Sequence, residues 1–204
     1  MESKTQWRIL LGIVFVALIV VPLASLINIP ADNALDFIIR ITALWGLVGL
    51  SLSALMNINK RVLYQKFGLK FMKLHHAMAI FAFLFATLHP VVFAFKVGSA
   101  AIFIPNFSSW YLFWLLGGRP ALIVMYIALA AVLLRKRTKK AWKCLHRLIY
   151  VALILIIVHG ILIGTDFKSP LILVFFVILT GAALFTGIYL RFKNPKRKKN
   201  KTAA

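Results

Sequence analysis

The chain contains five histidines, and four of them form two similar pairs along the sequence. His75 and His89 are 14 residues apart, and His146 and His159 are 13 residues apart. On α-helices that rise about 1.5 Å per residue, these steps correspond to about 21 Å and about 19.5 Å. Ionisable side chains within apolar segments are costly and usually have a function. Because the two separations are similar, the histidines of the two segments can meet at two separate levels, one from each segment at each level. Two imidazoles at each level suit a metal that needs only two axial nitrogens, which describes haem iron. Zinc would instead need about four ligands at one point.

The helical phase of the two pairs differs. A step of 14 residues returns to within about 40° of the same helix face, whereas a step of 13 residues lands about 140° away. Pro90 gives the first segment a reason to kink. The second segment has no such residue, so we expect it to tilt, to bend, or to hold His146 in a frayed first turn. His76 is the alternative to His75, and helical phase favours His75.

The segments that carry these histidines are apolar enough to lie in a membrane. Of the 204 residues, 62% are hydrophobic, against about 45–50% in soluble domains, and the mean hydropathy is +0.93. A helix needs about 20 apolar residues to cross a bilayer. We therefore predict an all-α fold, a single integral membrane bundle of six transmembrane helices. The predicted spans are about 9–29, 36–56, 73–95, 119–134, 146–164 and 170–190, and a basic tail follows at 191–204.

The distribution of charge predicts how this bundle is oriented. The net charge is +21, and all but four of the 25 Lys and Arg residues fall on one side of the predicted bundle. The positive-inside rule then places both termini in the cytoplasm. Contact with anionic membrane lipid explains the basic loops better than nucleic-acid binding does. The protein is thus expected to be a multi-pass protein of a bacterial or archaeal plasma (inner) membrane.

Other motifs limit the chemistry further. The single Cys144 and the lack of a CxxCH motif exclude covalent c-type haem attachment. No glycine-rich phosphate-binding motif occurs. The segment 96–118 is crowded with aromatic residues, as is typical of segments at a membrane interface, and we expect it to lie along the outer surface. A lid over a substrate is the alternative for this segment.

Two stretches carry a resemblance to a known family: KLHHAMAIFAFLFATLHP, which begins at residue 73, and LHRLIYVALILIIVHG, which ends at residue 160. Over about residues 36–190 the chain resembles the ferric reductase-like transmembrane domain family. That family includes ferric reductases, the membrane part of NADPH oxidases and the haem-binding membrane subunit of the bacterial periplasmic methionine sulfoxide reductase. The resemblance implies six helices and two stacked, non-covalent b-type haems. The inner haem would bind His75 and His146, and the outer haem would bind His89 and His159.

The same resemblance implies a function in electron transfer. Electrons would pass from a cytoplasmic donor to an acceptor on the outer side, either ferric iron or a periplasmic reductase subunit. The chain stops after the sixth predicted span, so we expect an oxidoreductase component without its own flavin or NAD(P)H domain. Its donor would be a cytoplasmic flavin reductase, a reduced flavin such as FMN, or a quinol.

Haem propionates are anionic, and four cations lie near the two levels. Lys73 and Arg147 are candidates at the inner level, and Arg40 and Arg119 at the outer level. An unpaired charge inside a span is costly. For Arg40 the alternative role is therefore an ion pair with Asp36, one helical turn earlier.

Two other functions are alternatives to electron transfer. A metal or proton transporter lined by histidines would be colourless, and its ligands would converge at one depth. A structural membrane anchor would not require the histidines at all.

Overall fold

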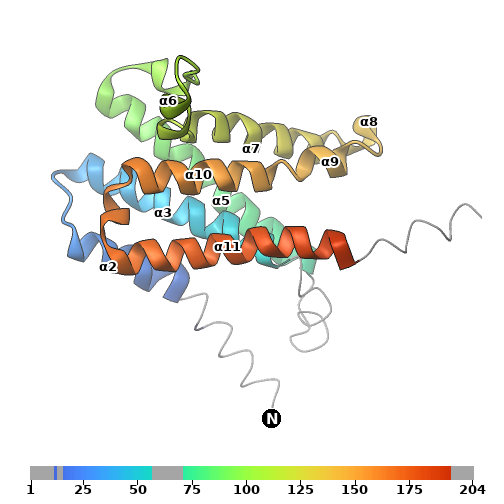
Figure 1. Cartoon of the computed structure of the whole chain (residues 1–204), viewed down its shortest axis with the longest axis horizontal. Coiled ribbons are helices and arrows are strands. Elements are labelled where there is room, and N and C mark those ends of the chain that lie inside the picture. Colours follow the sequence, from blue (N-terminus) through green and yellow to red (C-terminus); the bar gives the residue numbers. More distant parts are fainter. Residues whose placement is uncertain (1–11, 13–15, 57–70, 194–204) are drawn as a thin grey trace, which may run out of the picture.

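The computed structural model describes residue 12 and residues 16–56 and 71–193 of the chain. All regular structure in these residues is helical, which confirms the predicted all-α class. The helices run mainly along one long axis, as Figure 1 shows. Their bounds are η1 Val16–Val20 (a π-helix), α2 Val21–Asn28, α3 Ala34–Leu55, α5 Phe71–Val97, η2 Ala100–Phe103 (a 3₁₀-helix), α6 Trp110–Leu115, α7 Gly118–Leu133, α8 Arg135–Thr138, α9 Trp142–His146, α10 Ile149–Ile163, η3 Thr165–Lys168 (a 3₁₀-helix) and α11 Pro170–Lys193.

Among the described residues, three helical segments are long and apolar enough to cross a membrane. They are Ala34–Leu55, Met72–Val97 and Trp142–Ile163. The helices Gly118–Leu133 and Pro170–Phe185 are apolar but shorter. Of the predicted spans, the second, third and fifth thus meet the length criterion, and the count of six remains a prediction. The start of the first predicted span, the first basic inner loop and residues 194–204 of the basic tail lie outside the described residues.

Helix α3 forms the centre of the bundle. Asn33 caps its N-terminus, because its side-chain oxygen accepts a hydrogen bond from the Asp36 amide at 2.9 Å. Leu44, Leu47 and Val48 are almost fully buried in the core. The helix packs against α2, α5, α10 and α11. Between α3 and α11, the hydroxyls of Ser51 and Thr180 are hydrogen-bonded at 3.3 Å.

Small residues set the close contact between α3 and α5. A Cβ atom added at Gly46 would lie 2.9 Å from the backbone nitrogen of Ala86, and one added at Gly49 would lie 2.9 Å from the Cβ of Ala82. Real Cβ atoms almost never come that close to another atom. Glycine and alanine therefore allow the two backbones to approach, as is common between membrane helices.

The fifth predicted span is interrupted between α9 and α10. The amides of Arg147, Leu148 and Tyr150 each donate to the carbonyl three residues earlier, as in a 3₁₀-helix rather than an α-helix. A 3₁₀-helix turns about 120° per residue instead of about 100°, so this junction adds rotation between His146 and His159. The structure thus distorts this span by a break just after His146. The break removes part of the mismatch in helical phase between His146 and His159.

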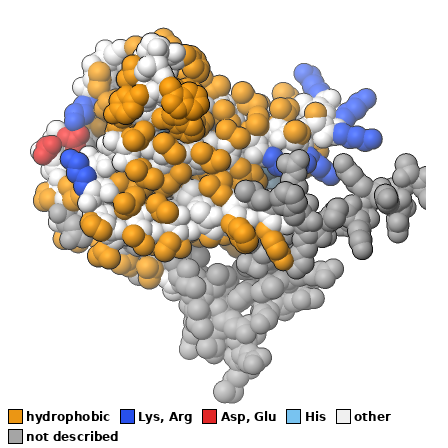
Figure 2. All heavy atoms as spheres, viewed as in Figure 1, with side chains coloured by type: hydrophobic (Ala, Val, Ile, Leu, Met, Phe, Trp, Pro, Cys, Tyr) orange, Lys and Arg blue, Asp and Glu red, His pale blue; other side chains and the backbone are white. Residues whose placement is uncertain are grey.

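Charged side chains gather at the two ends of the long axis. The described acids, Asp32, Asp36 and Asp166, lie at the end formed by the α2–α3 connection and η3, which is on the left in Figures 1 and 2. The cations of residues 135–143 lie at the opposite end, around α8. Hydrophobic side chains cover much of the surface between the two ends, as Figure 2 shows.

Candidate functional site

Two of the predicted histidines, His89 and His159, line one cavity at the acidic end of the bundle. His89 lies on α5 and His159 lies on α10. The cavity has a volume of about 610 Å³ and is also lined by α3, η3 and the start of α7. Cofactor sites usually have volumes of about 300–1,000 Å³ and a mostly apolar lining. The structure thus brings this pair together in a space large enough for a cofactor.

Backbone carbonyls hold both imidazoles in this cavity. The Nδ1 atom of His89 is 2.9 Å from the carbonyl oxygen of Ile39, and the Nδ1 atom of His159 is 2.7 Å from that of Leu115. A carbonyl oxygen can only accept, so in each ring Nδ1 carries the hydrogen and donates it. In a neutral imidazole the Nε2 atom then keeps its lone pair. Metal-binding histidines typically have this arrangement, in which a partner fixes both the tautomer and the orientation of the ring.

Gly118 borders the other nitrogen of His159. A Cβ atom added at Gly118 would lie 3.0 Å from Nε2 and 3.1 Å from Cδ2 of that ring. Gly118 also lines the cavity. The absence of a side chain at this position therefore leaves room beside the nitrogen that would bind a metal.

The other two predicted ligands, His75 and His146, lie together toward the basic end. Their ring centres are 6.3 Å apart, and the ring planes are nearly perpendicular, at 89°. The two imidazoles are therefore near neighbours in the structure.

The surroundings of these two rings differ. The Nδ1 atom of His75 is 3.2 Å from the carbonyl oxygen of Ser53 and 3.0 Å from its hydroxyl. The Nδ1 atom of His146 is buried, and no atom of the described residues meets hydrogen-bonding geometry with it. The His146 side chain interacts with the backbone of Ala128. His76 is exposed, and its ring centre is 6.1 Å from that of His75. Of the two neighbouring histidines, His75 is thus the one beside His146.

Residues 42–157, more than half of the chain, match the family model described as "Ferric reductase like transmembrane component". The chain belongs to the ferric reductase-like transmembrane family. This membership confirms the resemblance stated above and indicates transmembrane electron transfer in a membrane location. No curated protein and no solved structure matches the chain.

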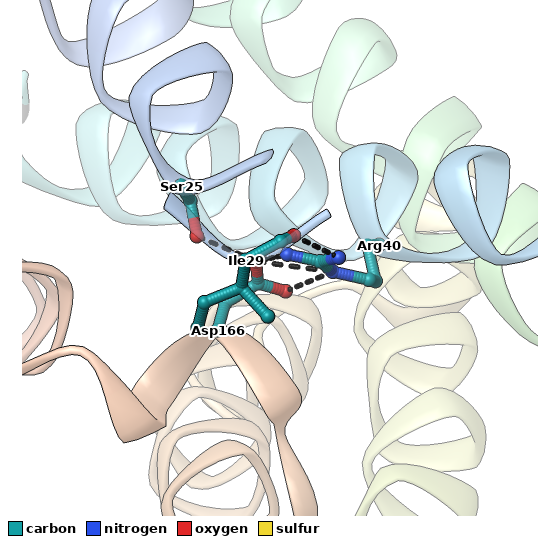
Figure 3. Close-up of polar contacts among 4 residues, drawn as sticks. All are labelled: Ser25, Ile29, Arg40 and Asp166. Atoms are coloured by element: carbon teal, nitrogen blue, oxygen red, sulfur yellow. Dashed lines mark hydrogen bonds and ion pairs between the residues drawn. The ribbon is translucent and has the colours of Figure 1, made fainter. Parts of the chain in front are cut away.

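In this ferric reductase-like protein, Arg40 belongs to a buried network in the cavity wall (Figure 3). Its Nε is 3.2 Å from both carboxylate oxygens of Asp166, and its Nη2 donates to Oδ1 of Asp166 at 2.6 Å. Its Nη1 donates to the carbonyl oxygen of Ile29 at 2.5 Å, and the Ser25 hydroxyl donates to Asp166 at 2.5 Å. The Arg40 and Asp166 side chains are 10% and 6% exposed. The network joins α2, α3 and η3.

The alternative role predicted for Arg40, an ion pair with Asp36, was wrong. Asp36 instead forms an ion pair with Lys96 of α5. A pair one helical turn apart is worth only about 0.2–0.5 kcal/mol. A buried guanidinium needs several acceptors at once, and Asp166 and Ile29 provide them.

The other predicted cations lie near the two histidine pairs. Arg119 lines the cavity, and its Nη1 donates to the carbonyl oxygens of Ala101 and Ile104 at 3.3 and 3.0 Å. Arg147 is exposed directly after His146, and its Nε donates to the Lys143 carbonyl at 2.9 Å. Lys73 is exposed, two residues before His75.

Several residues of the site were not identified from the sequence. They are Asp166, Ser25, Gly118, Ser53 and the carbonyl groups of Ile39 and Leu115. A signal existed for Asp166, because a buried Arg40 needs an acid and the chain has only four Asp and Glu residues. Among the residues that the structure describes, no three His, Cys, Asp or Glu side chains come together as a group that could hold a metal ion. The four predicted histidines lie in two pairs instead.

Proposed function

We propose that this protein is a di-haem b-type transmembrane electron-transfer protein. Electrons would enter from a donor at the basic, cytoplasmic end and leave to an acceptor at the acidic, outer end. The observation that supports this proposal best is the arrangement of four imidazoles as two pairs at two levels. At least two of these rings donate Nδ1–H to a backbone carbonyl, which leaves Nε2 as the nitrogen for the metal.

The four histidines would hold two non-covalent haems, and the cavity lined by His89 and His159 supports the outer of the two sites. His75 and His146 would hold the inner haem, and His89 and His159 would hold the outer haem. Haem iron, when bound, supplies a one-electron change of valence. Two histidines at each level would favour electron relay over oxygen binding. The task of the protein is then to bind, orient and shield the cofactor.

Cations near each level would compensate the carboxylates of the cofactor. Arg147 and Lys73 are exposed near the inner pair. Arg40 and Arg119 line the outer cavity. A propionate at Arg40 would compete with Asp166 for the guanidinium. At Arg119 it would replace contacts with the neutral carbonyls of Ala101 and Ile104, so Arg119 is the easier of the two cations to engage.

The membrane arrangement remains part of the proposal. The protein would cross a bacterial or archaeal inner membrane with six transmembrane helices. Both of its termini would lie in the cytoplasm. The donor would be a cytoplasmic flavin reductase or a reduced flavin such as FMN. The acceptor would be ferric iron or a periplasmic reductase subunit. The protein would be the electron-transfer component of an oxidoreductase.

An absorption spectrum of the protein purified after expression with ample haem tests the proposal. We expect a Soret band, a sharp α band after reduction with dithionite, and two haems per chain in a pyridine haemochromogen assay. His89→Ala and His159→Ala should each remove one haem and leave the other. A colourless protein would refute the proposal, and a transporter lined by histidines would then become the better explanation.

A further inference from the structure

The surface around α8 carries a dense group of cations next to the inner histidine pair. We call this group the basic corner. It consists of Arg135, Lys136, Arg137, Lys139, Lys140 and Lys143, all of which are exposed. None of them forms an ion pair with a described residue, and the described acids lie at the opposite end of the molecule.

The basic corner is directly connected to the inner histidine pair. The ammonium group of Lys143 lies 5.7 Å from the ring centre of Trp142. The Trp142 ring centre is in turn 6.5 Å from that of His146, which is 6.3 Å from that of His75. A molecule that docks on the basic corner would therefore be separated from the inner site by one aromatic side chain.

The direction of the cations favours a partner in the aqueous phase. Figure 2 shows Lys and Arg side chains at this end extending outward past the hydrophobic surface. Cations that serve only to hold a helix in the bilayer lay their stems along apolar surface. Lys139 has a φ of 46°, a left-handed conformation that is uncommon for residues other than glycine. The turn thus keeps a cation where glycine would be easier to accommodate.

We propose that the basic corner is the docking surface for an acidic electron-donor protein. This inference rests on the proposed function and specifies the partner of its inner site. Opposite charges on two surfaces raise association rates by about 10–10³-fold and fix the relative orientation of the partners. A donor with a carboxylate-rich face would dock with its redox centre facing Trp142.

The test uses binding, which does not depend on bound haem. The full-length protein is placed in nanodiscs of phosphatidylcholine, which expose both faces, and its association with flavodoxin, an acidic electron-transfer protein, is measured by interferometry. We expect K136E/R137E/K140E to lower the association rate by at least about 10-fold at low salt. The difference should nearly vanish at 0.5 M salt, where the Debye length falls below about 5 Å. Cytochrome c, a basic protein, should not bind to the native surface.

Single variants provide the matched control. Lys140→Glu should slow association, whereas Lys168→Glu, which changes an exposed lysine at the opposite end, should not. Equal effects of the two single variants, or no effect of the triple variant, would overturn the proposal. So would binding that appears only when anionic lipid is added, since the cations would then serve lipid contact. A colourless protein that still binds flavodoxin through these cations would refute the di-haem function and leave the docking surface intact.

Discussion

Removal of the Asp166 carboxylate should destabilise the protein strongly. In the native protein this group accepts hydrogen bonds from Arg40 and from the Ser25 hydroxyl. The variant Asp166→Ala would leave the Arg40 guanidinium buried, and the Ile29 carbonyl would be its one remaining acceptor among the described residues. The arginine could not simply lose its charge, because a guanidinium group stays protonated in proteins.

The size of the effect follows from the burial of the pair. The Arg40 and Asp166 side chains are only 10% and 6% exposed. Removing one partner of a buried ion pair lowers the free energy of unfolding by about 3–5 kcal/mol. For a chain of this size, such a loss corresponds to a decrease in melting temperature of about 6–20 °C. The double variant R40M/D166L should recover much of the loss, because it buries no charge.

The matched control is Asp36→Ala, which removes an acid at the same end of the molecule. Its partner Lys96 is 37% exposed, and ion pairs of this kind contribute about 0–1 kcal/mol. Thermal unfolding of the three variants in the same detergent, followed by circular dichroism, measures the differences. Equal losses for Asp166→Ala and Asp36→Ala, or no recovery in the double variant, would show that the buried charge does not dominate.

Three further predictions concern helix packing and the histidines. Gly49→Ala should cost about 1–3 kcal/mol, because its Cβ would lie 2.9 Å from the Cβ of Ala82; Gly181→Ala, with open space around it, should be neutral or stabilising in the same thermal assay. Gly118→Ala places a Cβ 3.0 Å from Nε2 of His159 and should reduce the haem content toward one per chain in a haemochromogen assay; an unchanged ratio of haem to protein would contradict this role. His75→Ala should remove one haem, whereas His76→Ala, at an exposed position, should keep both. The reverse outcome would make His76 the ligand.

Hydrophobic length and spacing predicted the helical class, and three of the spans meet the length criterion. The spacing of the histidines within these apolar segments also singled out the four that the structure brings together in pairs. Helical phase correctly indicated a distortion near His146, because thirteen α-helical steps cannot return to the same face. It could not specify the form of the distortion. The 3₁₀ hydrogen bonds at Arg147, Leu148 and Tyr150 depend on how α9 and α10 pack.

Contacts between distant segments were harder to predict. The partner of Arg40 is 126 residues away, whereas local spacing offered Asp36 as the alternative to a propionate. Local rules describe exposed helix faces, whereas a buried charge selects the partner that satisfies most of its hydrogen bonds. The position of Gly118 beside His159 likewise follows from the packing of α7 on α10, which no local pattern encodes.

The hydrogen bonds to the histidine rings have a consequence for how this sequence can diverge. His89 and His159 each donate to a main-chain carbonyl, and His75 lies close to another. Every amino acid carries this carbonyl, proline included. Substitutions at Ile39 or Leu115 therefore change the side chain and leave the acceptor in place, whereas a substitution at Ser53 would also remove the hydroxyl that lies 3.0 Å from Nδ1 of His75. Relatives can lose all identity at Ile39 and Leu115 and still orient the same two imidazoles, so an alignment would leave these supporting contacts unmarked.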